Sequence, residues 1–166
     1  FDIPFPIKGK DDIINAYTKV LTEHPGIKIA VTDHISSPTA ILFPIKEIID
    51  VCHQHDVIVV IDGAHAPGHV QLTIEDYGAD YYTGNLCKWL MIPENLGFIW
   101  VHPKHQGTIQ PILTSHSAFS VDFRNRFYSP MTKDRITQIL MQDAVEFYEE
   151  LGGLEAITAR NKKMVT

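Results

Sequence analysis

The sequence predicts an α/β fold with a mostly parallel central sheet and helices on both faces. Short β-branched apolar runs alternate with amphipathic helical segments along the chain, which is typical of such a sheet. The run at 57–61 is apolar at every position, as expected of a parallel strand buried on both faces. The composition, 45% hydrophobic and 20% charged, suits a globular protein, and 166 residues is the size of one domain.

The first half of the chain is expected to form two helices, each followed by a strand. Residues 11–21 carry apolar side chains at helical spacing and begin with two aspartates, which suit the positive end of a helix. A strand is predicted at 27–31. Pro44 is well placed in the first turn of a second helix, 44–52, and the apolar strand 57–61 follows.

The second half of the chain predicts two further strands, at 80–83 and 97–101, and a long amphipathic helix at 136–151 that Gly152 and Gly153 end. In open α/β sheets, ligands bind beyond the carboxyl ends of the strands. The residues directly after each strand are therefore the candidates for a functional site.

Charge and composition argue against several classes of function. The net charge is -6 and no basic stripe is present, so nucleic-acid binding is not expected. No apolar stretch approaches the length of a membrane span. Cys52 and Cys87 are expected to be reduced thiols in a cytoplasmic protein. His53 and His55 lack further ligands at metal-binding spacing, so we expect no metal site.

Charged side chains follow two of the predicted strands. Residues 62–68, DGAHAPG, come after the strand 57–61, and residues 83–89, TGNLCKW, come after the next one. A carboxylate at the end of a buried strand is costly unless it meets a cation, so Asp62 and Lys88 are expected at one rim. The pair could be a structural ion pair in a plain ligand-binding domain, or part of an active site.

In this order and at this spacing, the two segments resemble the class V aminotransferase family of fold-type I pyridoxal-phosphate enzymes. The likeness, from about Ile27 to Lys163, is greatest to isopenicillin-N-epimerase-like and cysteine C–S lyase-like members. It implies pyridoxal 5'-phosphate held as a Schiff base by Lys88, and an amino-acid substrate. It also implies that Asp62 pairs with the pyridine nitrogen of the cofactor and that His65 faces its phenolic oxygen.

The resemblance assigns further cofactor contacts. Asn85 and Thr83 correspond to short polar residues that hold the phosphate, whereas Cys87 stands where the family commonly has histidine. Ser37 corresponds to an asparagine of the cysteine desulfurases that touches the cofactor or the substrate. Thr132 corresponds to a threonine that reaches the phosphate of the neighbouring subunit, which implies a homodimer.

The resemblance also implies that the chain is a fragment. Residues 1–150 correspond to the central part of the cofactor-binding large domain, and residues 151–166 to the start of the connection toward a C-terminal small domain. Alone, such a piece is expected to bind the cofactor weakly or not at all. The alternative hypothesis is a catalytically incomplete remnant that acts only as a structural or dimerisation partner.

Overall fold

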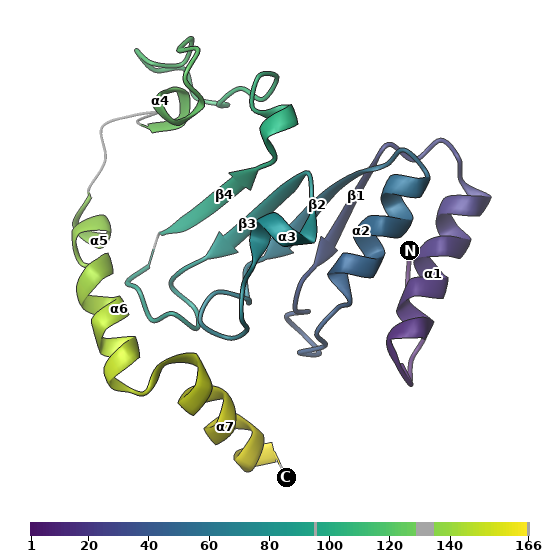
Figure 1. The fold of residues 1–166 in the computed structure, drawn as a ribbon, viewed down its shortest axis with the longest axis horizontal. Coiled ribbons are helices and arrows are strands. Elements are labelled where there is room, and N and C mark those ends of the chain that lie inside the picture. The colour runs from purple at the N-terminus through teal and green to yellow at the C-terminus, as the bar shows by residue number, and fades with distance from the viewer. Residues whose placement is uncertain (95, 129–134, 166) are drawn as a thin grey trace.

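The computed structural model describes residues 1–94, 96–128 and 135–165. These residues form one four-stranded sheet in the order β1-β2-β3-β4 (Figure 1). β1 (Ile29–Asp33), β2 (Ile58–Gly63) and β3 (Tyr81–Asn85) are parallel, and β4 (Gly97–Val101) pairs antiparallel to β3. The predicted α/β fold with a mostly parallel sheet is therefore confirmed.

Helices connect and flank these strands. Their bounds are α1 (Lys10–Glu23), α2 (Ile45–Gln54), α3 (Ile74–Tyr77), the 3-10 helix η1 (Pro103–His105), α4 (Phe123–Tyr128), α5 (Ile136–Ile139), α6 (Met141–Glu150) and α7 (Gly153–Val165). The two helices predicted in the first half of the chain are confirmed. The helix expected at 136–151 is instead split into α5 and α6 at Leu140, where the ψ angle of -3° departs from the usual helical value of about -42°.

The core lies between α2 and one face of the sheet. Val59, Ile61 and Tyr82 point from the strands into this core, where Ile48 and Ile49 of α2 meet them, and all five are at most 1% exposed. Helix α1 packs beside α2 (Figure 1).

The opposite face of the sheet is uncovered within the described residues. Ile29, Val31 and Ile99 are 57%, 68% and 44% exposed, although each lies within a strand. The expectation of helices on both faces is therefore met on one face only. Because the 57–61 run is apolar on both faces, its pattern could not indicate which face the helices of this chain cover.

The three parallel strands β1, β2 and β3 extend further toward their carboxyl ends than predicted. Backbone pairing continues past the last apolar residue, and the parallel register places Asp33 beside Asp62 and Asp62 beside Thr83. Registered neighbours in a sheet present their side chains to the same face. Two carboxylates and a hydroxyl therefore form one row at the carboxyl edge, on the uncovered face.

Candidate active site

Two loops meet at the carboxyl edge of the sheet, and their contact positions the site. The first follows β2 and the second follows β3. At Gly68, φ is +75°, and an added Cβ would lie 2.7 Å from the backbone of Trp89 and Leu90. Only glycine permits both this conformation and this approach. Tyr148 of α6 donates a hydrogen bond to the Gly68 carbonyl at 3.0 Å and so ties the loop to the C-terminal helices.

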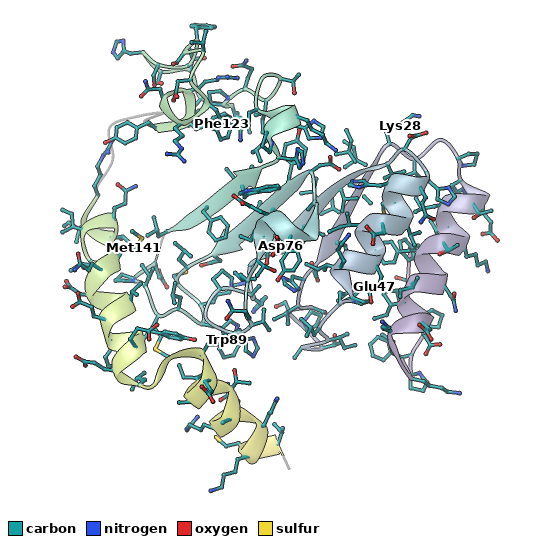
Figure 2. All side chains as sticks on the ribbon, in the orientation of Figure 1. Lys28, Glu47, Asp76, Trp89, Phe123 and Met141 are labelled. Carbon is teal, nitrogen blue, oxygen red and sulfur yellow. The ribbon has the colours of Figure 1, made fainter. Side chains whose placement is uncertain are left out.

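The contact brings Lys88 and His65 together. The Lys88 Nζ atom lies 3.0 Å from His65 Nε2, and the Trp89 Nε1–H donates to His65 Nδ1 at 3.3 Å. Burial, and then the charge of Lys88, lower the pKa of His65 below its ordinary value. Figure 2 shows Trp89 at the carboxyl edge, opposite Lys28, which precedes β1.

Asp62 lies exposed at the end of β2 and is not bound to the lysine. Its Oδ1 accepts the Ala64 N–H at 2.9 Å. Among the described side chains, no ion pair within 4.0 Å joins Asp62 to Lys88. A structural Asp62–Lys88 ion pair, the alternative left open by the sequence, therefore has no support in the geometry.

Asp33 is a rim residue that the sequence reasoning missed. Burial, and then the neighbouring charge of Asp62, raise the pKa of Asp33 above its ordinary value. The next residue, His34, is buried and shares a 2.7 Å hydrogen bond with the Tyr82 hydroxyl. Burial lowers the pKa of His34 to about 4. Asp33 lies two residues after the predicted strand that ends at Val31, so the same signal, a carboxylate beyond a strand, could have identified it.

Asn85, Cys87 and Thr83 border a cavity of about 480 Å³ beside the lysine turn. The Asn85 Oδ1 atom accepts both the N–H and the S–H of Cys87, each at 2.8 Å. This leaves the Asn85 amide NH₂ to donate to a ligand. The Thr83 hydroxyl donates to the Ile61 carbonyl at 3.4 Å. Cys87 therefore helps orient the side chain of Asn85, the residue expected to bind the phosphate, rather than only replacing a histidine.

Two predicted site residues are not placed in this cluster. Ser37 lies exposed in the turn at 37–39, and no described hydrogen bond joins it to Asp62, His65 or Lys88. Thr132 lies outside the described residues. Their proposed contacts with the cofactor remain predictions.

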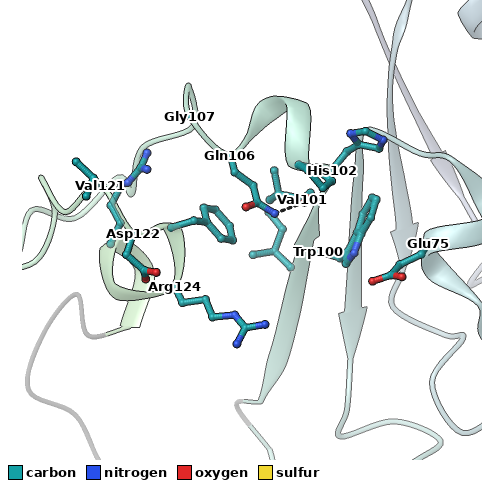
Figure 3. Close-up of a pocket in the computed structure, with 13 residues that line it drawn as sticks. Glu75, Trp100, Val101, His102, Gln106, Gly107, Val121, Asp122 and Arg124 are labelled. Atoms are coloured by element: carbon teal, nitrogen blue, oxygen red, sulfur yellow. Dashed lines mark hydrogen bonds between the residues drawn. The ribbon is translucent and has the colours of Figure 1, made fainter.

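A larger cavity, of about 840 Å³, lies elsewhere (Figure 3). Trp100, His102 and Arg124 are among its lining residues, and Asp62, His65 and Lys88 are not. Because β4 is antiparallel and Tyr81 pairs with Val101, the Val101 end of β4 lies at the amino edge of β3. This cavity is therefore separate from the candidate active site.

The described residues were also searched for metal-ligand clusters, cysteine pairs and helices that could span a membrane. The described residues contain no group of three or more histidine, cysteine, aspartate or glutamate side chains placed to hold a metal ion. His53, noted in the sequence, instead contacts Asp80 at 3.0 Å. Cys52 and Cys87 are both free thiols. No described helix combines the length and the apolar character needed to cross a membrane.

The fold and the rim define a class of protein: an α/β domain with a lysine amine, a histidine and carboxylates beyond the carboxyl ends of parallel strands. The sequence model of the aminotransferase class-V family matches residues 4–166. The chain belongs to this family, as the resemblance of its two loop motifs predicted.

Named relatives agree with this assignment. An L-cysteine desulfhydrase of Arabidopsis thaliana is 30% identical over 96% of this chain and 36% of the relative. An isopenicillin N epimerase of Amycolatopsis lactamdurans is 27% identical over 89% of this chain and 40% of the relative. The apo cysteine desulfurase of Thermococcus onnurineus NA1 superposes with a TM-score of 0.77 at 20% identity, over 96% of this chain and 42% of that one. The chain thus spans well under half the length of these relatives.

Proposed function

We propose that this chain carries the cofactor-binding core of a pyridoxal-phosphate enzyme that acts on an amino acid, with C–S lyase or epimerase-like chemistry. The observation that carries the proposal is the placement of Lys88. Its amine lies 3.0 Å from a half-buried histidine, rather than on a carboxylate, at the rim that Asp62 shares. The names of the curated relatives, cysteine desulfhydrase and epimerase, support the reaction types.

The chemistry of the donor set fits the cofactor. Asp62 offers an exposed carboxylate for a protonated pyridine nitrogen, and His65 offers a ring N–H for a phenolic oxygen. The Asn85 amide offers a donor for phosphate, with Thr83 beside it at the cavity. Lys88 supplies the amine that would hold the cofactor as a Schiff base. When bound, the cofactor supplies an electron sink for the substrate α-carbon.

The side chains of the protein would then stabilise positive charge and transfer a proton. Asp33 and Asp62 lie side by side in register, so a cation at this row is stabilised by two carboxylates. An amine is nucleophilic only without its extra proton, a form that lysine can reach and arginine cannot. Once released by the substrate, Lys88 Nζ would take the proton from the substrate α-carbon.

Replacing the lysine tests the proposal. In a full-length protein that contains this segment, Lys88→Ala should abolish the absorbance of the protein-bound cofactor and the release of sulfide from L-cysteine. Lys28→Ala is the matched control, because Lys28 is an exposed lysine at the opposite edge of the sheet (Figure 2). Equal cofactor spectra for the two variants would refute the assignment of Lys88.

Assembly and location belong to the same proposal. We propose a homodimer in which Thr132 reaches the partner's phosphate site, residues 1–150 as the central part of the large domain, and residues 151–166 as the start of a connection toward a small domain. The two free thiols support a reducing compartment, and we propose the cytoplasm. A monomer at equilibrium in the cofactor-loaded protein would contradict the dimer.

A further inference from the structure

Asp33 ends β1 with a carboxylate that has no direct partner in the described part of the chain. Within the ranges 1–94, 96–128 and 135–165, no hydrogen bond or ion pair reaches its side chain, although the residue is partly buried. We propose that Asp33 is a positioning residue of the cofactor site, whose charge adds to that of Asp62 and holds a protonated pyridine nitrogen there. This role rests on the proposed function, whereas the repulsion between the two carboxylates does not.

The pairing of β1 with β2 fixes the two carboxylates beside each other. Asp33 and Asp62 are partners in the parallel register. Neighbouring strands lie about 4.8 Å apart, and registered side chains share a face of the sheet. The His34 N–H donates to the Asp62 carbonyl at 2.8 Å, so backbone pairing continues beyond Asp33. Backbone hydrogen bonds, rather than flexible side chains, therefore set the spacing of the two charges.

The ionised pair is unfavourable as long as no cation lies on it. Burial, and then the charge of Asp62, raise the pKa of Asp33, whereas the charges of His65 and Lys88 lower it by less. The Lys88 amine, the cation of this rim, lies 3.0 Å from His65 Nε2 rather than on either carboxylate. Folding therefore brings two like charges together without neutralising them.

A bound cation reverses the sign of this interaction. A protonated ring nitrogen at Asp62 carries a positive charge, which two carboxylates attract more strongly than one does. The protonated ring is the better electron sink for the substrate α-carbon. Asp33 would thus stabilise the useful protonation state of the cofactor from a second strand. The same charge destabilises the fold when no cofactor is bound.

The titratable groups that face Asp33 come from four parts of the fold. They are Asp62 of β2, His65 of the loop after β2, Lys88 of the loop after β3, and Tyr17 of α1. Asp33→Asn removes one of the two carboxylates and leaves the other groups in place. Because asparagine has nearly the same shape as aspartate, the substitution changes the charge and little else.

The first measurement is the stability of the cofactor-free form of a full-length protein that contains this segment. A carboxyl group whose pKa is raised by folding destabilises the fold above that pKa. Asp33→Asn should therefore raise the urea midpoint at pH 7, and the gain should shrink as the pH falls toward about 4. Asp2→Asn is the matched control, because Asp2 is an exposed aspartate near the N-terminus, and its midpoint should not change.

The second measurement compares two ligands by equilibrium dialysis on the same full-length proteins. One is pyridoxal 5'-phosphate, and the other is its analogue with a C–H in place of the ring nitrogen. Asp33→Asn should weaken binding of pyridoxal 5'-phosphate by about three- to tenfold, up to the equivalent of one pKa unit. It should not weaken binding of the analogue, which has no ring proton to attract.

Three results would overturn the proposal. A lower urea midpoint for Asp33→Asn, or a variant that does not fold, would show that the carboxylate stabilises the structure. Unchanged affinity for pyridoxal 5'-phosphate would show that the charge does not act on the cofactor. An equal loss for both ligands would show that the ring nitrogen is not involved. A wild-type protein that binds no cofactor would refute the proposed function as well, while the urea midpoints would still decide the repulsion.

Discussion

Gly68→Ala tests the close packing of the two loops that form the site. Gly68 has a φ angle of +75°, and an alanine Cβ would lie 2.7 Å from the backbone of Trp89 and Leu90. Gly78 is an internal control, because its φ angle is +76° and nothing lies within 4 Å of an added Cβ. The two substitutions share the same backbone strain and differ only in the steric clash.

The expected magnitudes follow from these two contributions. A left-handed alanine costs about 1 to 2 kcal/mol relative to glycine, which is the whole effect expected for Gly78→Ala. Forcing a methyl group against packed backbone costs roughly 1 to 3 kcal/mol more. Gly68→Ala should therefore lower the free energy of unfolding by about 2 to 5 kcal/mol. Gly68→Ala should also weaken cofactor binding, because moving the two loops apart to make room for the methyl group would separate His65 from Lys88.

Urea denaturation followed by circular dichroism measures both variants. Equal losses of stability for Gly68→Ala and Gly78→Ala would refute the close packing of the loops. A stable Gly68→Ala protein with unchanged cofactor affinity would show that the loop contact does not position the site.

Two further predictions concern buried polar groups. Asp80 is 1% exposed and accepts from four donors: Val59 N–H, His53, His105 and Lys104. Burial alone would raise the pKa of Asp80, but the hydrogen bonds, that of Lys104 first, hold it below its ordinary value. Asp80→Asn should therefore cost about 2 to 4 kcal/mol at neutral pH, less than a fully buried pair because Lys104 is half exposed. A carboxyl group whose pKa is lowered by folding stabilises the fold only above its pKa in the unfolded chain. The difference in free energy of unfolding between the wild type and Asp80→Asn should therefore become smaller below about pH 4 in urea titrations. A difference that stays constant with pH would contradict this reasoning. Tyr82→Phe removes the hydroxyl that pairs with buried His34 and should cost about 1 to 3 kcal/mol, whereas an unchanged urea midpoint would show that this hydrogen bond contributes nothing.

The positions of the strands along the chain and the shared rim of Asp62 and Lys88 could be predicted because both follow from local patterns. Apolar runs mark the strands, and the carboxyl ends of parallel strands meet at one edge. The strand ends were less predictable, because backbone pairing continues through polar residues such as Asp33 and Asp62. Here the register, rather than hydropathy, decides where a strand ends.

Two other features could not be obtained from the sequence. The contact of Trp89 with His65 depends on the loop conformation set at Gly68 and on side-chain rotamers, neither of which has a periodic signal. The exposure of one face of the sheet could not be predicted either, because Val31 and Ile29 are apolar whether or not another layer covers them. The described structure shows these side chains exposed, so an apolar pattern alone does not establish a covering layer.

Borohydride reduction of the cofactor-loaded protein, followed by mass mapping of the pyridoxyl group, tests the central claim most directly. The chain has ten lysines among its 14 basic residues, so the map discriminates between a specific site and general amine reactivity. We predict label concentrated on Lys88, and little on Lys28 at the opposite edge of the sheet. Label spread over the exposed lysines, or none on Lys88, would contradict it and favour a remnant that no longer performs the chemistry of its family.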